Sequence, residues 1–152
     1  MSARLCVIEY MGKEPVPNVP VVTRFVRAVI GCNCPDEVFR NIKVQRGSSA
    51  VKACSADCEL RVGGRLLIVV TSEPVAGLAA HLAEVIAEGK RARDEGKFNR
   101  FRLVVQAGKP AEGSAELFRA FESVSHKDER THVHVLPKGE VPNFFSHASD
   151  GD

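Results

Sequence analysis

Five consecutive apolar residues, Leu66 to Val70, constrain the fold of this 152-residue chain most strongly. A strand with one face in water alternates apolar and polar side chains, whereas a strand covered on both faces stays apolar throughout. The run therefore predicts a central strand with packed layers on both sides. Gly63 and Gly64 separate it from a second β-rich stretch, so we expect a β-hairpin near residues 59–71 with a primed turn.

Helical and strand patterns alternate after this run. The expected elements are a helix from Val75 to about Arg93, a strand at 101–106, a helix capped by Ser114 and a strand at 131–136. A strand–helix–strand–helix–strand order over residues 65–136 is typical of right-handed βαβ units with parallel strands. We therefore expect a single α/β domain over residues 1–140, with a mainly parallel central sheet flanked by helices.

The N-terminal half and the C-terminus give weaker patterns. We expect a strand at residues 3–10 that buries Cys6, a loop at 12–20, a helix from Pro20 to Gly31, a short strand at 42–46 and one helical turn at 53–58. Gly31 suits a left-handed position after a helix, and Pro35 suits the first turn of the next, which makes Cys34 its N-cap. Residues 141–152 form an expected flexible tail, with Phe144 and Phe145 docking on the domain or on a partner.

Composition argues against several classes of protein. Hydrophobic residues make up 44% and charged residues 26%, which is ordinary for a globular domain, and the net charge of +2 gives no general attraction to nucleic acid or an anionic membrane. The N-terminus lacks the apolar core of a signal peptide, and no apolar run approaches the ~20 residues of a membrane span. We therefore expect a cytoplasmic protein whose thiols are mostly reduced, which suits an odd cysteine count.

Four of the five cysteines form two close pairs, Cys32 with Cys34 and Cys54 with Cys58. A structural zinc or iron–sulfur site needs four soft ligands, commonly supplied as two pairs joined by a loop. The first pair is tighter than the C-x₂-C turn usual at zinc sites, and the second would place both sulfurs on one face of a helix. The leading hypothesis is therefore a small thiolate-bearing protein that binds zinc or an iron–sulfur cluster through these four residues.

Thiol redox chemistry competes with the metal hypothesis. A cysteine at a helix N-terminus has a lowered thiol pKa, although Asp36 and Glu37 would oppose that effect on Cys34. A disulfide between Cys32 and Cys34 would be strained by their spacing and easily reduced, as a regulatory bond would be. In the third interpretation the cysteines are unpartnered thiols in loops and packing positions.

A second candidate site lies where the expected parallel strands end. Gly108 and Lys109 follow one strand, and Ser114 begins the next helix, so glycine, lysine and free N–H groups would form a pocket for a small anion. This pocket motivates an alternative function from another class, a non-enzymatic module that binds an anionic ligand or a protein, with the cysteines as bystanders.

Two further groups of residues have ordinary explanations. The basic run from Lys90 to Arg102 is interpreted as a solvated helix end rather than a nucleic-acid site, because few aromatic residues accompany it. His132 and His134 share one face of an expected strand, where a metal role is the minor interpretation. The sequence leaves open whether the chain is an enzyme, and whether it forms a homo-oligomer or binds another protein.

Overall fold

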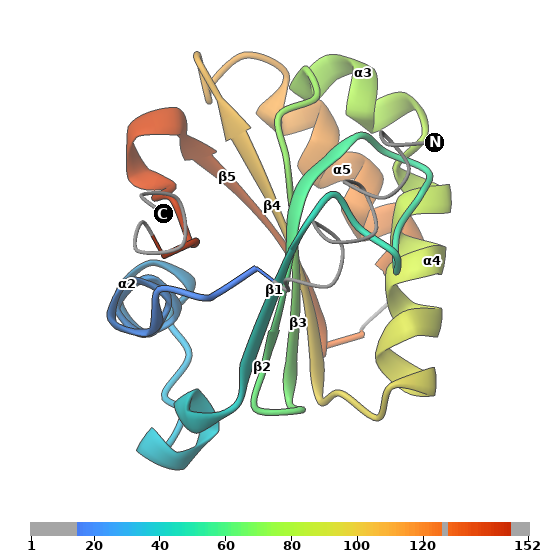
Figure 1. Cartoon of the computed structure of the whole chain (residues 1–152). Coiled ribbons are helices and arrows are strands. Elements are labelled where there is room, and N and C mark those ends of the chain that lie inside the picture. The colour runs from blue at the N-terminus through green and yellow to red at the C-terminus, as the bar shows by residue number, and fades with distance from the viewer. Residues whose placement is uncertain (1–14, 126–127, 147–152) are drawn as a thin grey trace, which may run out of the picture.

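The computed structural model describes residues 15–125 and 128–146, which form a five-stranded sheet with helices on both faces (Figure 1). The predicted strand at 3–10, with Cys6, lies outside the described residues. The strands are β1 (Ile42–Arg46), β2 (Ala56–Val62), β3 (Leu66–Thr71), β4 (Arg100–Ala107) and β5 (Thr131–Pro137). The helices are α2 (Val19–Arg24), the π-helix η1 (Phe25–Ile30), the 3₁₀-helix η2 (Asp36–Arg40), α3 (Val75–Ala80), α4 (Leu82–Glu95), α5 (Ser114–Ser125) and the 3₁₀-helix η3 (Lys138–Glu140).

The sheet is mixed, so the prediction of a mainly parallel sheet is wrong. Its strand order follows the chain, β1 to β5, and β2 pairs antiparallel with both β1 and β3. Only β3, β4 and β5 are parallel neighbours. The physical reason is the length of the connections: parallel neighbours need a crossover helix, and such helices begin only after β3. The βαβ argument therefore applied to the second half of the chain alone.

The hairpin between β2 and β3 confirms the primed turn predicted from the two glycines. Gly63 and Gly64 both have left-handed backbones, with φ of 62° and 66°. A Cβ atom at Gly63 would lie 2.6 Å from the carbonyl oxygen of Val38, so η2 packs directly on the turn. The turn thereby brings the beginning of β3 close to the segment that carries the first cysteine pair.

Each face of the sheet is covered by its own apolar cluster, and β3 is buried from end to end, as its sequence predicts. Leu66, Ile68 and Val70 pack with α2, η1 and the C-terminal segment. Leu67 and Val69 pack on the opposite face with α3, α4 and α5. Figure 1 shows α2 on one side of the sheet and these three helices on the other. Among the described helices, none is long and apolar enough to cross a membrane.

Several local predictions need correction. The helix expected from Val75 to about Arg93 is divided at His81, whose φ of −126° interrupts the helical backbone. Residues expected to form a helical turn at 53–58 instead begin β2, because the sheet pairing continues from the hairpin as far as Ala56. The first helical hydrogen bond of α5 goes to the carbonyl of Gly113, which makes Ser114 the first helical residue rather than the cap.

The described part of the C-terminal segment is packed rather than flexible. Phe144 and Phe145 are 2% and 7% exposed, which confirms that they dock on the domain. The Phe144 ring meets Phe25 edge-on at 5.0 Å between ring centroids, and the Asn18 N–H donates to the Phe144 carbonyl at 2.8 Å. This segment holds the α2–η1 unit, and with it the cysteine-bearing corner, against the sheet.

Candidate functional site

Cys32 and Cys34 occupy the corner between η1 and η2. Gly31 ends the π-helix with a φ of 82°, which confirms the predicted left-handed position. Pro35 is the N-cap of η2 instead of its first residue, so the prediction of Cys34 as the N-cap is wrong. The shift has a simple cause: the extended backbone of Pro35, with ψ of 157°, delays the first helical residue to Asp36.

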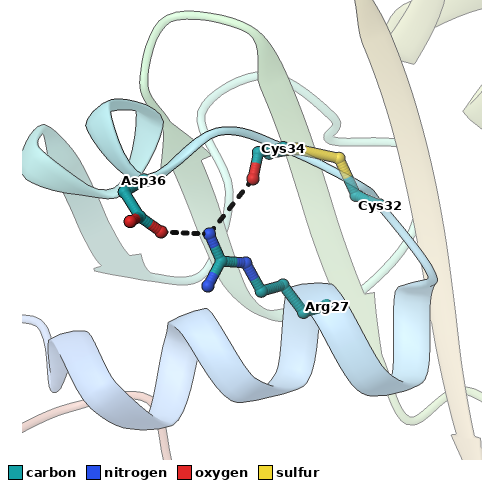
Figure 2. The surroundings of a disulfide bond; sticks show 4 residues. All are labelled: Arg27, Cys32, Cys34 and Asp36. Carbon is teal, nitrogen blue, oxygen red and sulfur yellow. Dashed lines mark hydrogen bonds and ion pairs between the residues drawn. A yellow bond between two sulfur atoms is a disulfide. The ribbon is translucent and has the colours of Figure 1, made fainter.

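The two cysteines are joined by a disulfide bond, with 5.5 Å between their Cα atoms (Figure 2). Both side chains are partly buried against the apolar cluster around α2, whereas Gly31, Asn33 and Pro35 are exposed. Because both cysteines are only partly buried and line an open pocket, a reagent in solution can reach this corner. This pairing is the one anticipated by the redox interpretation of the sequence.

Arg27 fixes the geometry of the corner from below, as Figure 2 shows. Its guanidinium donates to the Cys34 carbonyl at 3.1 Å and forms an ion pair with Asp36, while it stacks over the Phe39 ring at 4.9 Å. The hydrogen bond and charge of Arg27 lower the pKa of the Asp36 carboxyl. Of the two carboxylates expected to oppose a thiolate on Cys34, Asp36 is therefore paired with a cation, whereas Glu37 forms no ion pair in the described residues.

A pocket of about 420 Å³ opens beside the disulfide. Its described lining residues include both cysteines and three arginines, Arg65, Arg100 and Arg102, and include no aspartate or glutamate. Arg65 follows the glycine turn, and the two others alternate along the first residues of β4. The pocket is thus formed where the N-terminal ends of β3 and β4 meet the cysteine corner.

The three arginines have no ion-pair partner within residues 15–125 and 128–146. Arg100 donates to the backbone carbonyl of Glu129 at 3.2 Å, which leaves its charge uncompensated. The Nε atom of Arg102 is buried and has no hydrogen-bond partner in the described chain. A buried donor without a partner is costly, and such atoms in native structures call for an explanation, for which a ligand is one candidate.

Histidines beside Arg102 do not offset its charge. Burial, followed by the charge of Arg102, lowers the pKa of His134 to about 4, and the same causes lower the pKa of His132. Both rings are neutral at pH 7, and His134 Nε2 lies 3.1 Å from an Arg102 terminal nitrogen as its hydrogen-bond acceptor. Burial and the neighbouring Arg100 lower the pKa of Arg102 itself, but the guanidinium stays charged. The pocket is therefore a concentrated positive site.

The second cysteine pair lies elsewhere. Cys54 packs in the cluster beneath α3 and α4, and Cys58 packs in the cluster on the opposite face of the sheet. Cys58 is opposite Val70, four residues along β3 from the Leu66 that lines the pocket, which is roughly 13 Å along a strand. Burial raises the pKa of Cys54 to about 11 and that of Cys58 to about 12.

The described residues thus bring two of the four predicted metal ligands together, as a disulfide, and keep the others apart. They contain no cluster of three or more His, Cys, Asp or Glu side chains placed to hold a metal ion. His132 and His134 also have their Nε2 atoms engaged, by the Glu129 carbonyl and by Arg102. A four-cysteine metal site stays a prediction from the sequence.

The predicted anion site is formed only in part. Gly108 and Lys109 line a separate pocket at the carboxyl ends of the strands, together with Glu73, Glu112 and Glu116. Lys109 lies 3.6 Å from Glu112, and the Ser114 hydroxyl donates to the Ala111 carbonyl. Carboxylates here compete with any incoming anion, so this pocket is electrostatically weaker than the one beside the disulfide.

Comparison with known proteins does not assign the chain to a family. No family model, curated protein or solved structure matches this chain. The function must therefore be argued from the site itself.

The interpretation of the basic run as a solvated helix end missed Arg100 and Arg102 as pocket residues. The signal for finding them is the alternation of polar and apolar residues from Arg100 to Leu103, which places both arginines on one face of a strand.

Proposed function

We propose that the protein is a thiol–disulfide redox protein whose reactive group is the Cys32–Cys34 pair. The observation that carries this proposal is the position of the disulfide, at an accessible corner and on the wall of a pocket with three uncompensated arginines. A disulfide that served only as an apolar packing element would need no such charges around it.

The chemistry is thiol–disulfide exchange. A thiolate of an external thiol attacks one of the two sulfurs, which forms a mixed disulfide as the Cys32–Cys34 bond breaks and the other cysteine leaves as a thiolate. A second external thiolate attacks the mixed disulfide and releases the oxidised external disulfide. Two electrons pass from two external thiols to the protein pair, whose two thiolates take up protons from water according to their pKa. The reverse sequence oxidises the protein dithiol.

Positive charge favours this exchange because the leaving cysteine departs as an anion. Guanidinium groups near a thiol lower its pKa and speed its departure. The three pocket arginines supply positive charge on one side of the corner, and the pairing of Arg27 with Asp36 offsets the negative charge of that carboxylate.

A purely structural role explains the disulfide less well. In the chain-entropy description, a disulfide stabilises a fold by closing a loop in the unfolded chain, and the stabilisation is smaller for a shorter loop. Cys32 and Cys34 are separated by one residue, so their bond closes a minimal loop. Hydrogen bonds from Arg27 and packing of η1 already hold the corner in place.

The test is the reactivity of individual cysteines in the native, reduced protein. The protein is reduced, freed of reductant and treated with iodoacetamide at pH 7, and each modified cysteine is timed by peptide mass spectrometry. Because burial raises the pKa of Cys54 to about 11, one of Cys32 and Cys34 should react on the order of 10²-fold faster than Cys54. It should also react faster than free cysteine.

Two further measurements complete the test. In glutathione redox buffers, the Cys32–Cys34 pair should interconvert reversibly as one two-electron couple, and C32S and C34S should each abolish it. Rates no faster than that of free cysteine, or a pair that stays fixed in one state across the buffers, would contradict the proposal. Zinc and iron analysis of the same reduced sample tests the metal prediction from the sequence.

A further inference from the structure

We infer that the pocket beside the disulfide selects an anionic low-molecular-weight thiol, whose carboxylate or phosphate oxygens bind Arg65, Arg100 and Arg102 while its sulfur reacts at Cys32–Cys34. This inference rests on the proposed redox function and names its substrate class. It concerns the concave, positively charged pocket, which thiol–disulfide exchange alone does not require.

The first argument is charge. Guanidinium groups bind carboxylate and phosphate with paired N–H donors, and Arg65, Arg100 and Arg102 lack any carboxylate partner in residues 15–125 and 128–146. Some exposed cations elsewhere in the described residues, such as Arg91 and Arg119, also lack an ion pair, but Arg65, Arg100 and Arg102 line one pocket together and its lining includes no aspartate or glutamate. The gathering of three unpaired guanidiniums around one cavity marks the pocket as a place for an external anion.

The second argument is the buried Nε of Arg102, which has no partner in the described part of the chain. One terminal nitrogen of the same guanidinium already donates to neutral His134, so an incoming anion adds to its bonding without displacing a carboxylate. An oxyanion would also relieve the repulsion between Arg100 and Arg102, which contributes to the lowered pKa of Arg102.

The third argument is size and adjacency. A pocket of about 420 Å³ is at the small end of sites that hold small molecules. Both cysteines and all three arginines line the same pocket, which places the reactive pair and the guanidiniums within the span of one ligand. A folded protein partner would have to insert a side chain into this space, whereas a small thiol enters whole.

The experiment measures reduction of the Cys32–Cys34 disulfide by three thiols. 3-Mercaptopropionate supplies a carboxylate, 2-mercaptoethyl phosphate supplies a phosphate, and 2-mercaptoethanol is the neutral probe of similar length to the first. Rates are compared between the native chain and the R65Q/R100Q double variant, whose two side chains are exposed, so that the fold is kept. Each probe is its own reference, and differences in thiol pKa between probes therefore cancel. R119Q, which removes an exposed charge from α5 on the opposite side of the sheet, is the matched control.

We expect the double variant to be reduced more slowly by every thiol, because positive charge near the leaving cysteine is lost, and to lose about tenfold more rate with an anionic thiol than with 2-mercaptoethanol. Added salt should slow the anionic probe in the native chain more than in the variant. Selectivity confined to one anionic probe would identify carboxylate or phosphate as the source. Equal effects on all three probes, or equal effects of R119Q, would overturn the inference and leave the redox function standing.

Failure of the redox function has a different signature. If no thiol reduces the disulfide, the exchange proposal is wrong, and binding of the unreactive analogue S-methylglutathione then decides about the pocket. Calorimetric binding that weakens about tenfold in the double variant would support anion selection on its own. Absence of binding, or binding equal in both proteins, would refute it.

Discussion

Acidification should destabilise this protein through His134, well before its carboxylates are protonated. The His134 ring is partly buried on β5, and its Nε2 accepts a hydrogen bond from Arg102 at 3.1 Å. A protonated ring would lose that acceptor and place a second positive charge against the guanidinium. Burial and Arg102 therefore hold the pKa of His134 at about 4 in the folded chain, against 6.5 ordinarily.

The sign and size follow from proton linkage. The unfolded chain binds a proton at His134 below about pH 6.5, whereas the folded chain does so only near pH 4, so stability falls as the pH is lowered between these values. Integrating the difference in bound protons from pH 7 to pH 5 lowers the free energy of unfolding by about 2 kcal/mol, since each pKa unit is worth about 1.4 kcal/mol. Solvent in the neighbouring pocket screens part of this, so we expect between about 1 and 2 kcal/mol.

Urea unfolding of the oxidised protein at pH 7 and pH 5 measures the effect. The H134Q variant cannot titrate at this position. Between pH 7 and pH 5, its free energy of unfolding should therefore fall by about 1 to 2 kcal/mol less than that of the native chain. All other groups are common to both proteins and cancel in the difference. H132Q is the companion variant, because the pKa of His132 is also lowered and its contribution has the same sign. An unchanged pH dependence in H134Q would show that the ring is not held neutral by Arg102.

Two matched pairs of glycine substitutions test the packing. Gly63→Ala and Gly64→Ala place a side chain on similar left-handed backbones, but only the first meets backbone of η2, at 2.6 Å. In chemical denaturation we expect Gly64→Ala to lower the free energy of unfolding by about 1 kcal/mol, and Gly63→Ala to lower it by at least about 2 kcal/mol more. Gly89→Ala would place its Cβ 2.1 Å from the buried Phe101 ring and should lower stability by about 1–3 kcal/mol. Gly77→Ala meets nothing within 4 Å and should raise stability by about 0.5–1 kcal/mol through helix propensity. Equal losses within either pair would contradict the packing described.

Local patterns of the sequence predicted the elements that their own residues determine. The all-apolar β3, the turn at Gly63 and Gly64, and the left-handed Gly31 follow from periodicity and backbone sterics and are confirmed. The turn at Gly63 and Gly64 also makes β2 antiparallel to β3, whereas short-range patterns carry no information on the pairing of β1 with β2. The prediction of a mainly parallel sheet was wrong because it extended the βαβ argument to strands that no crossover helix connects.

The candidate site also combines a part that the local sequence predicts with a part that depends on the tertiary structure. The closeness of Cys32 and Cys34 needs no tertiary structure, because their spacing alone brings the sulfurs together. Arg65 and Arg100 are far apart in the chain, and they meet because Leu66 pairs with Arg100 across the parallel β3–β4 ladder. Composition records a net charge of only +2, since cations and anions balance over the whole chain. Alternation along β4 places Arg100 and Arg102 on one face, and the register of the sheet adds Arg65 to them.

That register also explains why the disulfide and the arginine pocket belong to one site. The Asn99 and Arg100 amides donate to the Arg65 carbonyl at 2.8 and 3.0 Å, which ties the start of β4 to the residue before β3. The glycine turn that precedes Arg65 is itself in contact with η2, the helix that follows Cys34. The backbone that positions the sulfurs and the backbone that positions the guanidiniums are therefore joined through the same turn. A change at Gly63 should disturb disulfide reactivity as well as stability, whereas one at Gly89, beneath the opposite face, should affect stability alone.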